Sequence, residues 1–464
     1  MFLRKWFIQP FLCLTNINFI KMKRRKFIKS LALGSTAIGM PAILPQGSLF
    51  ASTGYAMADH VVFVAFAGGV RQQESVLQRY LADSQDYPSE GNILYNLLDG
   101  AYPDEKIVYG TTNDVTGDTP IPKILNQTLE SQGTLFKEMI SSHAGHYGGL
   151  NTLLTGNYQY TQGLNSKSQM PTIFEYARRH LGVPASKVWY IGNGIGNSIP
   201  LLDYSIHSDY GSQYGANFLA PTITFGSDGF QHLKNAKVYH PEEELDPMYK
   251  MKYFLDNVWY SQGKSLPNIG NTEEEKYEIK EFFKDMFAKT EQGTIAHPPI
   301  NGGELDAIGY ACEVLQRFKP KITVVYLSSV DVCHSNFTSY LQNLHRADHG
   351  VGHLWDYIQN QIPEMSGKTA IILAPEQGRN LEPNNIVDAN GFKAYDHSDS
   401  NTRRVFGLMA GPGIPSSIPA VGGEGAPVGD LLNITPTIAE ILGFKQDIIG
   451  AGLIADNQSL FDLI

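Results

Sequence analysis

Two apolar, β-branched runs separated by a helical pattern dominate the C-terminal half of the chain. The first run, KITVVYLSSVDVCH, spans Lys321 to His334, and the second, KTAIILAPEQG, ends at Gly378. Between them lies NFTSYLQNLHRADHGVGHLWDYIQ, which has the apolar period of a long helix. A strand, a helix and a second strand in this order predict a parallel βαβ unit. Because ligands bind just past the carboxyl ends of strands in open parallel sheets, the polar residues that end both runs are the first candidates for a functional site.

The same alternation continues on both sides of this unit. We predict further strands at HVVFVAF (60–66), KVWYIGNG and RRVFGLMAG, and a strand, a glycine-rich turn and a helix from about Tyr147 within FKEMISSHAGHYGGLNTLLTGNY. Helices are predicted at QQESVLQRYLADS, MPTIFEYARRHLG, PMYKMKYFLDNVWY, EEEKYEIKEFFKDMFAK, ELDAIGYACEVLQRF and TPTIAEILG. This order predicts an α/β fold with a mainly parallel sheet sandwiched by helices. Residues 195–300, rich in Tyr, Gly, Ser and Asn, are interpreted as an insertion or cap beside that sheet.

The N-terminal segment, residues 1–58, has the pattern of an export signal. The basic run KRRKFIK (23–29) precedes the short apolar stretch LALGSTAIGMPAIL and then small residues. The apolar stretch is shorter than the roughly 20 residues that span a bilayer, although an uncleaved membrane anchor is the alternative interpretation. Arg24 and Arg25, followed by FIK, resemble a twin-arginine signal, with Lys23 where that pattern usually has Ser or Thr.

This signal predicts that the protein is exported to the periplasm or the cell surface of a bacterium. Met22 is then the expected start of the chain, and cleavage is expected after Ala58, in AMA, or earlier near Ala51. The mature chain, from about residue 59 to 464, is expected to have no transmembrane span.

Charge and cysteine content narrow the classes of function. The net charge is −10, but residues 1–58 hold eight basic and no acidic residues, which leaves 28 basic against 46 acidic residues, a net charge near −18, for the rest. Such an acidic body argues against general nucleic-acid binding, which requires a basic surface. Beyond the leader the chain has only Cys312 and Cys333, too few for a disulfide framework, and we expect both to be buried free thiols.

Polar residues cluster at four predicted strand ends: 68–71, 142–149, 331–334 and 376–379. His397 joins them from the loop AYDHSDS, just before a predicted strand. Asp and His are the ligands that Zn²⁺ prefers where thiolates are absent, so Asp331, His334 and His397 could bind one ion. Three protein ligands with one open position are typical of catalytic zinc. The alternative is that Asp331 caps the following helix.

Seven motifs follow one another along the chain: VVFVAFAGGVR, GHYGGLNTLLTGNY, YLSSVDVCH, RADHGVGHLW, APEQGRN, DHSDSNTRRVFGLMAGPGI and LLNITPTIAEILG. This order resembles the alkaline phosphatase superfamily, which includes sulfatases, nucleotide pyrophosphatase/phosphodiesterases and cofactor-independent phosphoglycerate mutases. The resemblance covers about residues 59 to 464 and implies an alkaline phosphatase-like α/β domain with a two-metal site. Asp331 and His334 are three apart where the family usually has four.

When the family's residues are matched one by one to this sequence, the ligands of the first metal site have suitable residue types. Those of the second site differ. It assigns the first metal to Asp331, His334 and His397, the same three residues that spacing suggested. At the second site Gly68, or Ala67 with a one-residue slip, stands where the family has Asp, and Glu376 and Gln377 stand where it has Asp and His. Glu376 can still bind a cation. The resemblance therefore implies one divalent ion rather than two, with zinc the expected metal.

The family nucleophile, a Ser, Thr or modified Cys, falls on His146. We predict an exported, metal-dependent hydrolase of phosphate or sulfate esters, in which Arg71 contacts a small anionic ester or glycan-type substrate. His146 is the candidate nucleophile or base, although a hydrogen-bonded structural role is the alternative. Two other functions stay open: a degenerate relative that binds a ligand or partner without catalysis, and a structural role at the cell surface.

Overall fold

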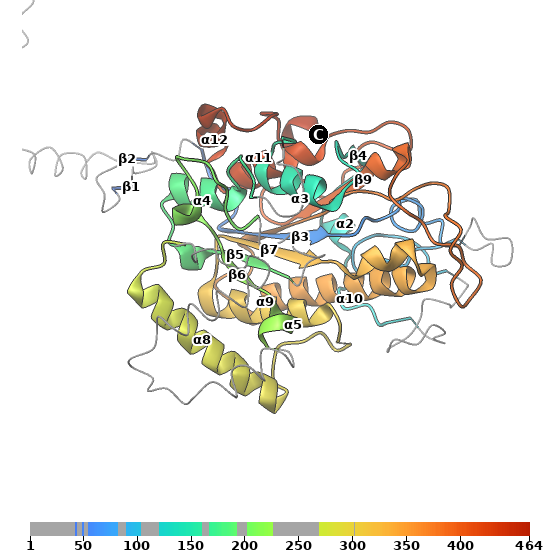
Figure 1. Cartoon of the computed structure of the whole chain (residues 1–464), viewed down its shortest axis with the longest axis horizontal. Coiled ribbons are helices and arrows are strands. Elements are labelled where there is room, and N and C mark those ends of the chain that lie inside the picture. The colour runs from blue at the N-terminus through green and yellow to red at the C-terminus, as the bar shows by residue number, and fades with distance from the viewer. Residues whose placement is uncertain are drawn as a thin grey trace, which may run out of the picture. The chain divides into compact units, whose positions relative to one another are not determined.

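The computed structural model describes residues 42–43, 49–50, 54–81, 90–103, 120–159, 167–192, 202–225, 269–300 and 302–464 (Figure 1). All of these residues lie within one compact unit, 41–464. Among them, no helix combines the length and the apolar character that crossing a membrane requires.

A seven-stranded sheet organises this unit, in the order β4-β9-β8-β3-β7-β5-β6. Its strands are β3 His60–Phe66, β4 Gly133–Ile140, β5 Val188–Ile191, β6 Asn217–Leu219, β7 Ile322–Leu327, β8 Thr369–Pro375 and β9 Arg404–Ala410. β3 pairs in parallel with β7 and β8, and β5 pairs in parallel with β6 and β7. Only β9, within this sheet, runs against its neighbours β4 and β8. The predicted α/β class with a mainly parallel sheet is confirmed.

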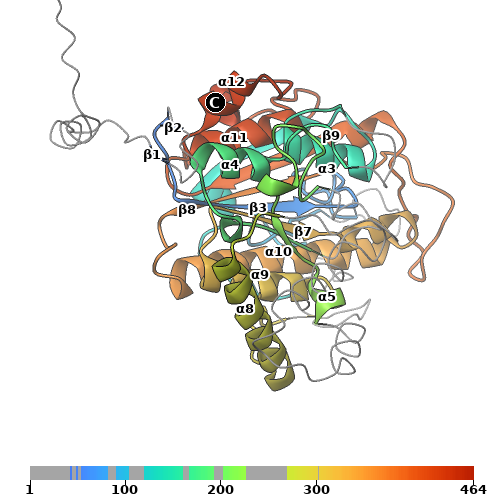
Figure 2. The same ribbon diagram turned by 60° about the vertical axis from the view of Figure 1, so that its left-hand side comes forward.

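Helices cover both faces of the sheet (Figures 1 and 2). Their bounds are α2 Leu129–Gln132, α3 His146–Thr155, α4 Ile173–Leu181, α5 Pro221–Thr224, α8 Glu273–Gln292, α9 Leu305–Phe318, α10 Phe337–Gln361, α11 Ile434–Ile441 and α12 Lys445–Ala451. Side chains of a strand alternate between faces, so Val62 and Val64 of β3 join the core beneath α8, α9 and α10. Val61 and Phe63 join the core beneath α3, α4 and α11. Because both faces are buried, every residue of β3 is buried, as its unbroken apolar run predicted.

Local capping signals set the ends of these helices. α4 begins with a capping box between Thr172 and Glu175 and ends at Gly182, which has a left-handed conformation. α10 begins at Asn336, whose side chain accepts a hydrogen bond from the backbone N–H of Ser339. The alternative in which Asp331 caps this helix is therefore wrong.

The predicted helix QQESVLQRYLADS is also wrong over its described part. Residues 72–77 form turns, and Gln78 and Leu81 have φ values of 52° and 54°. Left-handed conformations are costly for residues with a Cβ and cannot continue a right-handed helix. The tertiary environment overrides the apolar pattern here, because this segment contains the buried ion pair Arg71–Glu74.

Part of the region predicted as an insertion belongs to the sheet. β6 lies within 195–300, and it forms the edge strand beside β5. α8 of the same region begins with a capping box between Thr272 and Glu275. The predicted helix PMYKMKYFLDNVWY lies outside the described residues. Cys312 and Cys333 are both buried and unbridged, as predicted.

The end of the predicted leader is attached to the body of the fold. β1 (Ala42–Ile43) pairs antiparallel with β2 (Leu49–Phe50). Further on, Gly54 N–H donates to Gly443 O at 3.2 Å, and Met57 N–H donates to Ile441 O at 2.7 Å. Ala58 is 6% exposed.

Candidate metal centre

The carboxyl ends of β3, β4, β7 and β8 meet at one edge of the sheet. β9 runs in the opposite direction, so the residues that precede it arrive at the same edge. All four predicted polar clusters and His397 follow or precede these strand ends. The edge therefore collects side chains that are more than 300 residues apart in the sequence.

Three histidines converge at this edge. His146 is the first residue of α3, after β4; His334 ends the 3-10 helix Ser329–His334, after β7; and His397 precedes β9. One ring nitrogen from each lies within 4.8 Å of the corresponding atoms of the other two. The ring centroids of His146 and His397 are 4.9 Å apart, and those of His334 and His397 are 5.2 Å apart. Among the described residues, this is the one group of His, Cys, Asp and Glu side chains placed to hold a metal ion.

The backbone fixes the tautomer of His397. Its Nδ1 lies 2.7 Å from Ala144 O, and because a carbonyl oxygen only accepts, Nδ1 carries the proton. Burial, with the positive charges of Arg379 and His146, lowers the pKa of His397 below its ordinary value. The ring is therefore neutral near pH 7, with the Nε2 lone pair left for a ligand.

A buried carboxylate orients His146. Its Nδ1 donates to Glu376 Oε1 at 2.6 Å, and the same oxygen accepts from Gly68 N–H at 2.7 Å. Burial lowers the pKa of His146, but the hydrogen bond to Glu376 and the charges of Glu376 and Asp331 outweigh burial and raise the pKa above its ordinary value. A carboxylate behind a histidine is the arrangement that orients metal-binding imidazoles and raises their basicity.

Asp331 stands between the histidines and a buried arginine. Its Oδ1 lies 2.8 Å from His334 Nε2, 3.5 Å from His146 Nε2 and 2.7 Å from a terminal guanidinium nitrogen of Arg379. Burial raises the pKa of Asp331, but the hydrogen bond to His334 and the positive charges of His146 and Arg379 lower it to about 2. Asp331 is therefore a carboxylate at any pH at which the protein is used.

Arg379 is a part of the site that sequence reasoning did not assign. It is fully buried, and besides the Asp331 carboxylate it donates to Asp331 O at 3.3 Å and to Tyr395 O at 3.4 Å. It thus joins the loop after β7 to the segment that carries His397. The sequence signal that could have identified Arg379 as a site residue is its position at a strand end, three residues after Glu376.

Arg71 lies away from the histidines in a pair of its own. It is 1% exposed, its Nε donates to Glu74 Oε2 at 2.9 Å, and its guanidinium lies 3.9 Å from the ring centroid of Tyr395. This geometry stacks the cation on an aromatic face and pairs it with a carboxylate. Contact between Arg71 and an anionic substrate stays a prediction.

The structure brings Asp331, His334 and His397 together and adds His146. Glu376 lies behind His146, with one oxygen already bound. No side chain can extend from Gly68 beside this group. This glycine has a φ of 100°, and a Cβ there would lie 2.5 Å from the Cα of Asp331.

The residues present fit one divalent ion. Three imidazoles are a donor set that Zn²⁺ accepts, and two of them have a hydrogen-bond partner on the far nitrogen that directs Nε2 towards the group. The buried Oε2 of Glu376 has no hydrogen-bond partner in the described part of the chain, so this carboxylate has capacity left to accept a proton.

No protein-family model matches the chain, and no curated protein does. Several solved structures resemble its fold. One is an alkaline phosphatase superfamily protein from Vibrio parahaemolyticus, at 11% identity and a TM-score of 0.39, covering 91% of this chain and 76% of the other. Another is alkaline phosphatase from the Antarctic bacterium TAB5, at 11% identity and a TM-score of 0.39, covering 83% and 99%. A third is the C-terminal periplasmic domain of EcEptC from Escherichia coli, at 10% identity and a TM-score of 0.40, covering 84% and 83%.

The likeness to these structures concerns the fold alone. What the site can do chemically follows from its own residues.

Proposed function

We propose that this protein is a metal-dependent hydrolase of phosphate or sulfate esters. His146, His334 and His397 would hold one divalent ion, with zinc the metal that this donor set favours. The observation that supports the proposal is the convergence of the three imidazoles, within 4.8 Å, at the carboxyl edge of the sheet.

A divalent ion at this position supplies Lewis acidity towards an ester oxygen. The chain's own residues prepare the site around it. Glu376 orients His146 by accepting a hydrogen bond from its Nδ1–H, while Arg379 holds the Asp331 carboxylate beside His334. We include Asp331 as a further ligand in this proposal. The Asp331→Ala variant tests that role.

The open coordination position supports an anionic substrate. The carboxylates of the site are Asp331, Glu376 and Asp396, whose Oδ1 lies 3.5 Å from His334 Nδ1, and its buried cation is Arg379. A divalent ion beside them would offset the remaining negative charge, and its open position would accept an oxygen of a phosphate or sulfate group. The small anionic ester, or a sulfated or phosphorylated glycan, is therefore the substrate class that we propose.

Metal analysis of the purified protein is the first test. We expect about one zinc or manganese ion per chain, and loss of that ion in His334→Ala and His397→Ala. His143→Ala is the matched control, because His143 lies near α3 but bonds to Tyr158 O and lies outside the histidine group. A protein that resists loading with both metals would refute the proposal.

A screen of phosphate and sulfate mono- and diesters then tests catalysis. We expect hydrolysis by the loaded protein, retained in His143→Ala and reduced at least about 100-fold in His397→Ala and in Asp331→Ala. Hydrolysis that survives both substitutions would refute the assignment. Metal binding without hydrolysis of any ester would instead support the alternative of a ligand-binding relative.

We also propose export through the twin-arginine signal at Arg24 and Arg25. Its support is the sequence pattern of residues 23–44. Replacing both arginines with lysine should retain the protein in the cytoplasm, as measured by cell fractionation with and without the substitutions. Equal export of both forms would exclude the twin-arginine route.

A further inference from the structure

Two buried histidines lie on one face of α10, outside the metal centre. His345 and His349 are four residues apart, which places them one above the other on the helix. Their exposed fractions are 1% and 2%. Buried imidazoles need partners on both ring nitrogens, and here those partners are backbone groups of separate loop segments.

His345 bridges two segments. Its Nδ1 lies 2.8 Å from Ile93 O, and its Nε2 lies 3.0 Å from the N–H of Ile121. A carbonyl oxygen can only accept and a backbone N–H can only donate. His345 must therefore be neutral, with its single proton on Nδ1.

His349 repeats the arrangement with the next segments. Its Nδ1 lies 3.1 Å from Pro122 O, and its Nε2 lies 3.4 Å from the N–H of Ile300. His349 must therefore also be neutral, with its single proton on Nδ1. Together, the two rings attach residues 93, 121–122 and 300 to the middle of α10.

The charged and titratable groups around the two rings are few. Tyr95 meets His345 edge-on at 4.9 Å, and Lys123 lies on the segment that His345 and His349 hold. On α10 itself the neighbours are Arg346, Asp348 and His353. Asp348 accepts hydrogen bonds from the N–H groups of Asn96 and Leu97, so it holds the first segment as well.

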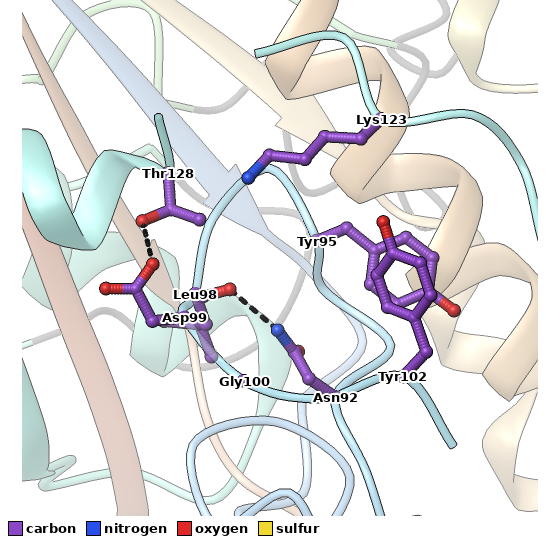
Figure 3. A pocket seen from close by; sticks show the side chains of 8 residues that line it. All are labelled: Asn92, Tyr95, Leu98, Asp99, Gly100, Tyr102, Lys123 and Thr128. Carbon is purple, nitrogen blue, oxygen red and sulfur yellow. Dashed lines mark hydrogen bonds between the residues drawn. The ribbon is translucent and has the colours of Figure 1, made fainter. Parts of the chain in front are cut away.

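The held segments also build a cavity. A cavity of about 370 Å³ is lined by residues from 92–102 and 123–128. Figure 3 shows the side chains that line it. Tyr95 and Tyr102 lie against each other on one side, with ring centroids 4.1 Å apart. Across from them, Thr128 donates to Asp99 at 2.7 Å, and the Lys123 amine extends over the opening. Because these walls belong to the attached segments, the two histidines and Asp348 together hold them in place.

We propose that His345 and His349 form an acid-sensitive clamp that holds the segments 90–103, 120–128 and 293–300 against α10. A second proton on either ring occupies Nε2, which is the nitrogen that accepts the backbone hydrogen bond. The new N–H then points at the backbone N–H of Ile121 or Ile300, so two donors face each other. The attached segment must then separate, which also opens the cavity of Figure 3. This clamp does not depend on the proposed hydrolase function.

The direction of the pH effect follows from the neutral state that the fold requires. Burial lowers the pKa of His345 to about 4, and burial lowers the pKa of His349 as well. The clamp is therefore intact above the ordinary histidine pKa of about 6.5 and weakens as the pH falls from there towards 4. Burial raises the pKa of Asp348 to about 7, so proton uptake by this group favours the folded state over the same range. A local measurement is needed to separate the two effects.

Hydrogen–deuterium exchange of the full-length protein at pH 7.5 and 4.5, corrected for intrinsic exchange rates, provides that measurement. The opening equilibrium of the three segments should rise by up to about tenfold per pH unit for each proton taken up. β3 and α4 should keep their protection. Unchanged protection in the segments would overturn the proposal, and so would a uniform loss across the whole protein.

A variant with non-titrating side chains sharpens the test. His345→Gln combined with His349→Gln supplies a donor and an acceptor at each position, so the acid response of the three segments should disappear. His353→Gln is the control for the segments 90–103 and 120–128, because the described hydrogen bond of the His353 ring goes to Ala296 O in the third segment. This variant should keep the response of the first two segments. If the double variant does not fold, imidazole NMR of the unsubstituted protein decides. Either ring found protonated at pH 7, or with its proton on Nε2, would refute the clamp.

Discussion

At the scale of single residues, the partner on the far nitrogen distinguishes the histidines of this chain. In the metal centre that partner is a carboxylate for His146 and a carbonyl for His397, so Nε2 of each faces its neighbours. On α10 both nitrogens of His345 are already bound to the backbone, which leaves that ring no lone pair for a metal. The same residue type therefore serves two purposes, and hydrogen-bond partners decide between them.

Glu376→Gln should weaken metal binding by about 10- to 100-fold, because the amide carries no charge to orient His146 and raise its basicity. Competition for zinc with a chromophoric chelator measures this affinity. Glu138→Gln is the matched control, since Glu138 is also buried and pairs with Arg404 rather than with a histidine. The control should lower stability and leave the affinity unchanged; equal losses in both variants would contradict the role of Glu376.

Metal affinity should also rise with pH through the neutral range. The pKa of His146 lies above its ordinary value, so below that pKa an ion must displace a proton from this ring. The apparent affinity then falls by up to about tenfold for each unit that the pH decreases. In Glu376→Gln the same fall should begin at a lower pH, because the raised pKa depends on Glu376. Zinc titrations between pH 6 and 8.5 check both expectations, and a flat profile would contradict them.

At the scale of elements, the site depends on how closely α3 approaches the turn after β8. Gly149 lies in the first turns of α3, and a Cβ there would meet Glu376 O at 2.2 Å. A contact below 3.0 Å with a backbone atom requires the backbone to move. The glycine therefore permits the approach that places His146 on Glu376.

Gly149→Ala should destabilise the protein by about 1–3 kcal/mol through overpacking, even though alanine favours helix. It should also weaken zinc binding by displacing His146. The matched control is Gly450→Ala in α12, where a Cβ has open space and should stabilise by up to about 1 kcal/mol. Urea denaturation measures both changes, and equal effects of the two substitutions would exclude the close contact as the cause.

The proposed export gives a second prediction at this scale. A protein exported by the proposed twin-arginine route would fold first, and in the folded protein Ala58 is buried while Met57 N–H donates to Ile441 O. Cleavage near Ala51 leaves this attachment in place, whereas cleavage after Ala58 requires its removal. Mass spectrometry of the exported protein should therefore find an N-terminus near residue 52. A mature chain that begins at Asp59 would contradict the docked arrangement.

Elements with a strong local signal could be predicted from the sequence. The unbroken apolar run of β3 and the capping residues of α4 determine those elements without reference to the rest of the fold. The turns at 72–81 could not be predicted, because a buried ion pair and two left-handed residues override the helical pattern. Likewise, the residue types at Asp331, His334 and His397 indicated a site. The position of Glu376 behind His146 depends on the packing of two distant segments.

At the scale of the whole molecule, one reversed strand completes the site. β9 runs against β4 and β8, so the loop before it brings His397 to the edge where β4 and β7 deliver His146 and His334. Arg379 connects two of these loops through its hydrogen bonds to Asp331 O and Tyr395 O. A metal ion would connect all three, across sequence separations that no local interaction spans.

Metal binding should therefore stabilise the whole fold. An ion that binds the folded chain but not the unfolded one adds about 2.7 kcal/mol to the free energy of unfolding when its free concentration is 100 times its Kd. Urea denaturation with and without zinc should show this increase in the unsubstituted protein and in His143→Ala. In His397→Ala the increase should largely disappear, since two imidazoles from β4 and β7 no longer bind the ion to the β9 loop. An equal increase in that variant would show that zinc stabilises the protein from another site, and it would remove the support for the three-histidine centre.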